Sequence, residues 1–177
     1  MKNTITAFFL LLSLSFHSQV AIGKTTVSNT AVSLEFGNAD KGMILPWVTN
    51  TTGVTGVVNG TMVYDLSDKK VKVKYAAAWK DLSINTAGTT VDPVTTVDGV
   101  TIQNAGTENT TSKVAIGTVT ATPGILVLED TNKAMVLPKV ASPHVNIKNP
   151  APGMMVYDTT TKLLVVFNGN VWTFWRP

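Results

Sequence analysis

An internal duplication constrains the fold of this chain more than any other feature. The tetrapeptide Met-Val-Tyr-Asp occurs at 62–65 and again at 155–158 of the 177 residues. Other matches keep the same order and a spacing of about 93 residues: 20–23 with 114–117, 41–46 with 133–138, and Trp79 with Trp172. The order predicts two tandem copies of a small module, a first repeat at 20–82 and a second at 114–177, joined by a linker at 83–113.

Each repeat is too small to be stable alone. A unit of about 60 residues buries only about 60% of the surface that its unfolded chain exposes. Repeated units that cannot each bury their own apolar face stack on neighbours, and two copies are few for such a stack. The duplication therefore also predicts a partner chain.

The local pattern predicts an all-β fold. Each repeat ends with a glycine, a short strand, a polar turn, a second strand, a small-residue turn and a strand that begins with Trp, which is the pattern of a three-stranded meander. Outside the N-terminus we find no segment with the 3.6-residue apolar period of a helix. The linker is rich in Thr, Val and Gly, and we expect it to be extended.

The middle strand differs between the repeats. The first copy alternates Lys and Val at 70–74, whereas the second reads Leu-Leu-Val-Val-Phe at 163–167, so one face has exchanged charge for apolar side chains. If Asn168-Gly169 forms a two-residue turn, Val165 pairs with Trp172 and Leu163 with Phe174. An apolar face of this size needs a cover. We predict a self-association interface formed by Leu163, Val165, Phe167, Trp172 and Phe174.

The composition excludes several classes of function. Because the chain has no cysteine, disulfides and thiolate metal sites are excluded, and the net charge of +3 is too small for a nucleic-acid binder. His144 lies alone in a Pro-rich loop, and the pair Asp65 and Asp68 offers too few oxygens for Ca²⁺. We therefore expect no catalytic residue, no metal and no cofactor.

The N-terminus resembles a secretory signal. Lys2 precedes an apolar run at 5–16, which is too short to span a bilayer. We assign 1–19 to a signal peptide, with the cleavage site between 19 and 24. No later segment reaches membrane-spanning length, so we expect a secreted, extracellular or cell-surface protein, with the periplasm as an alternative.

The tryptophans support a second hypothesis. Trp47, Trp79 and Trp175 could stack on sugar rings, as in a carbohydrate-binding module. A similar turn in the first repeat would place Trp79 beside Lys72. The alternative for Trp79 is ordinary packing under lysine side chains, with a cation–π contribution of about 0.5–1 kcal/mol.

The motifs resemble those of a known group of proteins. The segments VAIGxxTxxxxxxLxLE, KGMILP, GxMVYDxxxK and NGNVW are similar to modules of secreted surface and fibre-like proteins of certain Gram-negative bacteria, and to meanders in phage tail-fibre and head-fibre shafts. Those modules read VGIGTTTP, KGxLxPRMT and GLxVYDTxTxxLYVYNGTxW. The second repeat fits better, because Trp47 and the alanines at 76–78 replace the usual Arg and Asn-Gly.

The resemblance implies structural or adhesive display outside the cell, often as trimers. We therefore expect a non-enzymatic, fibre-like surface or adhesion protein that forms a homo-oligomer, with a homotrimer as the candidate state. It also implies that Thr159, in Asp-Thr-Thr, is a candidate O-glycosylation site. The alternatives are binding of a surface glycan and docking on an envelope partner, as an accessory subunit of a secretion or motility complex.

Overall fold

The computed structural model describes residues 19–84, 87–107, 109 and 111–176. Within them the chain is mostly β, with 36% strand and 8% helix, which confirms the expected class in broad terms. Residues 1–18 of the predicted signal peptide at 1–19 lie outside the described residues. The helical segments are short: η1 (Thr51–Gly53), α2 (Gly99–Asn104) and α3 (Pro143–Asn146). No helix in the described part of the chain combines the length and the apolar character that crossing a bilayer requires.

The strands of the first repeat are β1 (Val20–Ile22), β2 (Val32–Phe36), β3 (Met43–Ile44), β4 (Trp47–Val48), β5 (Met62–Asp65), β6 (Lys70–Tyr75) and β7 (Ala78–Asp81). Those of the second are β8 (Val114–Gly117), β9 (Leu126–Glu129), β10 (Ala134–Val136), β11 (Lys139–Val140), β12 (Met154–Asp158), β13 (Leu163–Phe167) and β14 (Trp172–Trp175). The two series correspond one to one, as the matched sequence segments predict.

Both predicted meanders are present. Strands β5, β6 and β7 pair antiparallel in order, as do β12, β13 and β14. A short parallel strand adds to the same edge of each meander, β4 on β5 and β11 on β12. Strands β1 and β2 pair parallel, and so do their counterparts β8 and β9.

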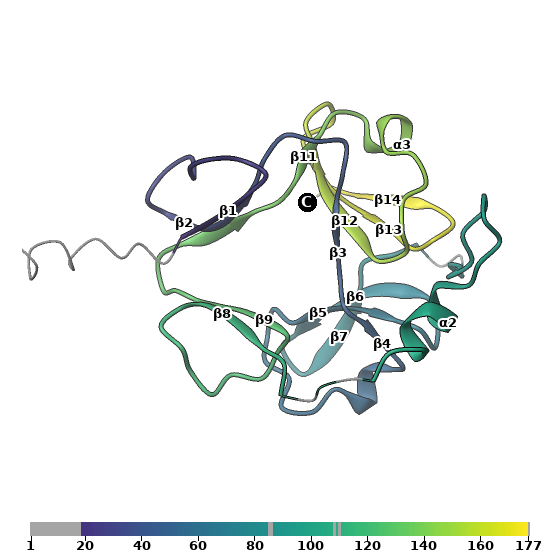
Figure 1. Cartoon of the computed structure of the whole chain (residues 1–177), viewed down its shortest axis with the longest axis horizontal. Coiled ribbons are helices and arrows are strands. Elements are labelled where there is room, and N and C mark those ends of the chain that lie inside the picture. The colour runs from purple at the N-terminus through teal and green to yellow at the C-terminus, as the bar shows by residue number, and fades with distance from the viewer. Residues whose placement is uncertain (1–18, 85–86, 108, 110, 177) are drawn as a thin grey trace, which may run out of the picture.

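Strand pairing crosses from one repeat to the other, so the prediction of two separate tandem modules is not supported. Strand β3 pairs antiparallel with β12, and β10 pairs parallel with β2. In Figure 1, β3 runs through the middle of the molecule between the two meanders. The green strand beside β1 and β2, at the left of the view, is β10. As a whole the chain reads as a β-solenoid of about nine turns rather than clearly as two tandem modules.

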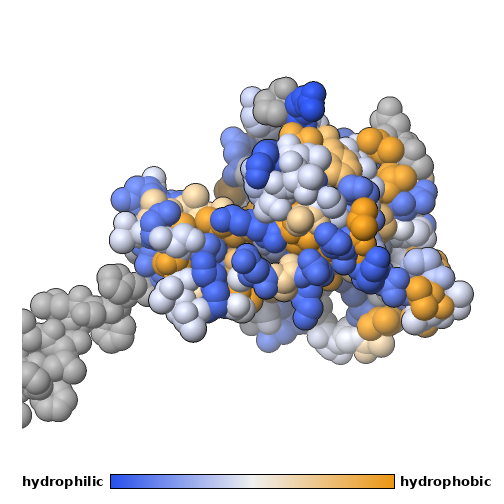
Figure 2. All heavy atoms as spheres, turned by 90° about the horizontal axis from the view of Figure 1, so that it is seen from above, coloured by the Kyte–Doolittle hydropathy of each residue, from blue (hydrophilic) through white to orange (hydrophobic). Residues whose placement is uncertain are grey.

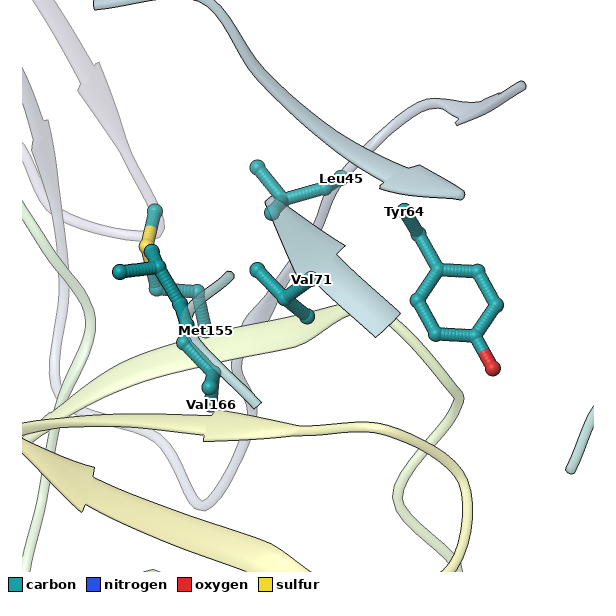
Figure 3. Packing of buried hydrophobic residues seen from close by; sticks show 6 residues of the cluster. Leu45, Tyr64, Val71, Met155 and Val166 are labelled. Carbon is teal, nitrogen blue, oxygen red and sulfur yellow. The ribbon is translucent and has the colours of Figure 1, made fainter. Parts of the chain in front are cut away.

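The main core also belongs to both repeats. Leu45, Tyr64, Val71 and Leu82 of the first repeat pack with Met155 and Val166 of the second, and all six are buried. Figure 3 shows Leu45 and Val71 facing Met155 and Val166 across the contact. Because these side chains alternate along their strands, each meander turns one apolar face toward the other repeat. Burial of this shared face is what holds the two repeats together.

The linker is less extended than predicted. It contains α2, whose first turn is capped by Asp98, and an isolated bridge between Val91 and Asp98. Thr89 donates its backbone N–H to the carbonyl of Asn168, so the linker packs on the second meander. Short polar side chains that cap turns, here Asp92 and Asp98, supply the local order that the composition alone did not reveal.

Candidate functional site

The contact between β3 and β12 is a short stretch of β-augmentation. Met43 lies opposite Met155, Ile44 lies opposite Met154, and the Leu45 N–H donates to the Gly153 carbonyl at 3.0 Å. The strand β11 continues along the same edge of β12, opposite Tyr157 and Asp158. An added strand of this kind gains affinity from main-chain hydrogen bonds and specificity from alternate side chains.

The contact between β10 and β2 has a different geometry. The pairing is parallel, with Met135 opposite Leu34 and Val136 opposite Glu35. The segments KGMILP and KAMVLP are equivalent in sequence, yet one occupies the edge of a meander and the other occupies the edge of a two-stranded ribbon. The same motif therefore has two binding partners in this fold.

Three aromatic side chains also donate hydrogen bonds from one repeat to the other. The Tyr64 hydroxyl donates to the Asn168 carbonyl at 2.8 Å, the Trp47 Nε1 to the Pro152 carbonyl at 2.9 Å, and the Trp175 Nε1 to the Leu82 carbonyl at 2.6 Å. Buried aromatic residues with a polar atom need such a partner. Burial raises the pKa of Tyr64 above its ordinary range, which keeps this hydroxyl a donor.

Gly153 lies at a close approach between the two repeats. Its φ is +79°, and a Cβ at this position would lie 2.9 Å from the Tyr64 Cβ and 3.3 Å from the Trp47 Nε1. The equivalent residue, Gly60, has a φ of +89° and open space around it. Both glycines satisfy the same turn, but only Gly153 also makes room for the other repeat.

The predicted interface residues lie on one face, as expected, and the chain itself covers most of that face. Val165 and Phe167 are buried with Val140 and Ile147, which come from β11 and from the end of α3. Leu163 and Trp172 pack against the same cluster, whereas Phe174 is 36% exposed. The assignment of these five residues to a self-association interface stays a prediction, and only Phe174 offers a large exposed surface in the single chain.

The predicted register of the last hairpin is wrong. Phe167 lies opposite Trp172 and Val165 opposite Phe174, instead of Val165 opposite Trp172. The Asn168 side chain accepts the backbone N–H groups of Asn170 and Val171, which closes a four-residue loop in place of the two-residue turn. An Asn at this position stabilises the wider turn through its own side chain.

The tryptophans proposed to bind carbohydrate do not form a common platform. The indoles of Trp47 and Trp175 are half-buried and hydrogen-bonded across the repeats, and the Trp47 ring lies 5.5 Å from that of Tyr64. Trp79 lies opposite Lys74 and not beside Lys72. The cation–π contact of the described residues is made by Lys80, 4.9 Å above the ring of Trp175. Two of the three tryptophans thus have a packing role.

Asp65 and Asp158 close equivalent turns. Asp158 accepts from the N–H of Thr160, the N–H of Ser142 and the hydroxyl of Thr161. Burial alone would raise the pKa of Asp158, but these hydrogen bonds outweigh burial and lower it. Asp65 has the same role with Ser67, and Lys72 lies between Asp65 and Asp68 at 2.9 and 2.5 Å. The lysine ammonium occupies the place where a shared cation would bind.

A polar hollow adjoins the end of β2. The carboxylate of Glu35 is nearly fully buried, lies 2.8 Å from the Lys24 ammonium and accepts from the Ser28 N–H at 2.6 Å. Lys24 and Ser28 hold the pKa of Glu35 at about 2. A carboxylate with a pKa this low is ionised near neutral pH and has no proton to donate.

Other candidate groups are scattered. His144 is exposed on α3, 5.7 Å from the ring of Phe174. Thr159 is half-buried, and its N–H donates to the Val140 carbonyl, so its glycosylation stays a prediction. No group of three or more His, Asp or Glu side chains with metal-binding geometry occurs in the described residues. Figure 2 shows apolar residues in small groups among hydrophilic ones on the face seen from above.

The residues that join the repeats were not identified as functional from the sequence. They include Met43, Leu45, Met135 and Gly153, which lie in or beside the matched motifs. The available signal was the repetition of Lys-x-Met-x-Leu-Pro, which indicates a shared role without indicating the partner of either copy.

Comparison with known proteins adds one finding. No curated protein and no solved structure matches the chain. A family model covers the second repeat from β8 to the end of β14, about a third of the chain. Residues 115–176 match the model described as a phage tail like trimerisation region.

Proposed function

We propose that this protein is a non-enzymatic, fibre-like structural component that forms a homotrimer through its second repeat and is displayed outside the cell. The observation that carries the proposal is the match of residues 115–176 to a phage tail like trimerisation region. That segment comprises a complete copy of the repeat, so one repeat from each of three chains would make the trimer.

The strand arrangement supports assembly. The repeats already join by adding a strand of one to a sheet edge of the other. Sheet edges left unpaired are ready to accept another chain, and β-strand addition is a common way for proteins to assemble. A second copy of the chain carries the same complementary segments.

The oligomeric state of the purified protein tests the central part of the proposal. Light scattering and native mass spectrometry at several concentrations should give a mass three times that of the chain. A mass that stays at one chain across the whole concentration range would remove the proposal.

Display outside the cell and adhesion are the finer parts of the proposal. They are supported by the apolar run after Lys2 and by the resemblance to surface modules. Antibody labelling of intact cells, compared with permeabilised cells, tests display. Pull-down from the native envelope should recover only further copies of this chain, and recovery of a stoichiometric envelope partner would favour an accessory-subunit role instead.

A further inference from the structure

The two repeats contact each other through unlike surfaces. The first repeat gives β3 to β12, and the second gives β10 to β2. If a two-fold axis related the repeats, β10 would pair with β5 and β3 would pair with β9, and neither pairing occurs among the described residues. A contact of this heterologous kind does not close with two members, but continues until it forms a ring or a filament.

Each contact between the repeats pairs one strand edge of each repeat, and the equivalent edges on the opposite repeats stay unpaired in the part of the chain that the structure describes. The Tyr64 N–H donates to the Pro46 carbonyl on the outer edge of β5, so Met62, two residues earlier, turns its backbone to the same edge. Within the described residues no strand pairs with Met62 there, whereas β3 fills the equivalent place beside Met155. The outer edge of β9 and one edge each of β3 and β10 are also unpaired in the part of the chain that the structure describes.

A third repeat would satisfy all four of these edges at once. Its own β3-type strand would pair with β5 and β9, its β2-type strand would pair with β3, and its meander would receive β10. Each interaction copies one that already exists in the chain. Three repeats therefore make the smallest closed ring, and this number agrees with a trimerisation region that covers a single repeat.

Three chains contain six repeats, enough for two such rings. Symmetry is kept if every chain contributes its first repeat to one ring and its second repeat to the other. The linker at 83–113 then connects the rings. Within each ring the partners of a repeat are the same repeat of the two neighbouring chains, so the pairing seen inside one chain is exchanged for the same pairing between chains.

We propose that in the homotrimer β10 of one chain takes the place on β12 of the next chain that β3 holds in the single chain. The proposal rests on the proposed function. The register follows from the repeat: Met135 lies opposite Met155 of the next chain, Val136 lies opposite Met154, and the Leu137 N–H donates to the Gly153 carbonyl. On its other edge, β10 pairs with β9 of the preceding chain, with Met135 opposite Leu128.

The two competing segments are chemically suited to exchange. KGMILP and KAMVLP keep Lys, Met, Leu and Pro in the same places and differ at two positions, where Ala134 stands for Gly42 and Val136 for Ile44. Loss of the Ile44 methylene is a small change in a packed site. A Cβ at Gly42 would lie too close to the Met154 Cγ, so Ala134 fits this place on β12 once the flexible Met154 side chain shifts. The exchange then pairs the edges that one chain leaves open.

Introduced cysteines can identify the partner of β12, because the chain has no cysteine of its own. Directly opposed residues on antiparallel strands have the separation that a disulfide requires. Two single variants, Met135→Cys and Met155→Cys, are co-expressed with different affinity tags, so that any disulfide between them joins two chains. We expect a covalent dimer under mild oxidation. The matched control, Met43→Cys with Met155→Cys on separate chains, should give none.

A double variant then tests closure of the ring. Met135→Cys/Met155→Cys in one chain should give covalent trimers and nothing larger on a non-reducing gel. Met62→Cys/Met135→Cys tests the alternative, in which each chain keeps its internal pairing and joins the next chain end to end. Covalent multimers from this second variant, with only monomers from the first, would overturn the proposal.

Native mass spectrometry distinguishes failure of the strand exchange from failure of the homotrimer. A homotrimer whose Met135→Cys and Met155→Cys chains do not cross-link rejects the strand exchange and leaves the trimer standing. A protein that is monomeric in every sample rejects the trimer itself. Circular dichroism of each single variant establishes that the substituted chain is folded. The variants Met135→Ser and Met155→Ser, in which serine has nearly the shape of cysteine, should assemble without cross-links.

Discussion

The hydroxyl of Tyr64, in the first repeat, donates a 2.8 Å hydrogen bond to the carbonyl of Asn168, in the second. The equivalent residue of the second repeat, Tyr157, is only half-buried, and its hydroxyl has no such bond among the described residues. Two residues with the same sequence context thus have different roles. The difference arises because the repeats contact each other through unlike surfaces.

Tyr64→Phe should therefore destabilise the single chain more than Tyr157→Phe. A buried neutral hydrogen bond contributes about 0.5–1.5 kcal/mol, and the Asn168 carbonyl keeps its bond from Thr89. We expect a loss of about 1 kcal/mol in the free energy of unfolding for Tyr64→Phe, measured by urea denaturation. Tyr157→Phe is the control and should stay within about 0.5 kcal/mol of the parent. Equal losses in the two variants would contradict the assigned role.

The glycine pair provides a second matched test. Gly60→Ala and Gly153→Ala both force alanine into a positive φ, which costs about 1–2 kcal/mol. Only at Gly153 does the new methyl group also meet the Tyr64 side chain, and overpacking adds about 1–3 kcal/mol. In the single chain, at concentrations below those at which it assembles, we expect thermal denaturation to show a clearly lower midpoint for Gly153→Ala than for Gly60→Ala. If the midpoints coincide, the repeats do not pack as described.

Stability should fall in acid through Glu35. Its pKa is about 2 in the folded chain, below the ordinary value of 4.5, first because Lys24 binds the carboxylate and then because Ser28 does. A lowered folded-state pKa gives stability that is complete above about pH 4.5 and is lost as the pH falls toward 2. Glu35→Gln should flatten the stability profile between these values in urea titrations. A parallel profile for parent and variant would show that other carboxylates cause the acid loss.

The two ends of the apolar face should respond differently to charge. Val165 is fully buried, so Val165→Lys places an uncompensated charge in the core and should abolish folding, which is visible as loss of the β signal in circular dichroism. Phe174 is 36% exposed, so Phe174→Lys should fold. If this face contributes to assembly, Phe174→Lys also lowers the trimer fraction in light scattering, and Phe174→Leu preserves it. Unchanged assembly of Phe174→Lys would exclude the exposed end of the face from the interface.

The local elements could be predicted because their signals lie within a few residues. Alternation at 70–74 and the repeated Met-Val-Tyr-Asp are enough to place both meanders. The predicted register of the last hairpin is wrong by two residues. The Asn168 side chain accepts hydrogen bonds from the N–H groups of Asn170 and Val171, which stabilise a wider turn than the predicted two-residue one. Such a choice between turn types depends on small differences in hydrogen bonding that a dipeptide signal does not contain.

The cover of the apolar face and the pairing of strands between the two repeats could not be predicted in the same way. Pro143–Asn146 is too short to show a helical period, yet α3 brings Ile147 onto the cluster around Val165. The likeness of 41–46 and 133–138 indicates a common role, but the partners lie about a hundred residues away. Periodicity reports which face is buried, and it does not report which segment buries it.

The position of β3 has a consequence for the time before assembly. A newly synthesised chain is alone, and an open strand edge at that stage invites pairing with any extended segment it meets. By laying Met43 and Ile44 along β12, the chain covers that edge with a segment of its own. The segment is only two residues long as a strand, so under the proposed exchange the chain would keep the edge from foreign segments until β10 of a neighbouring chain replaces it.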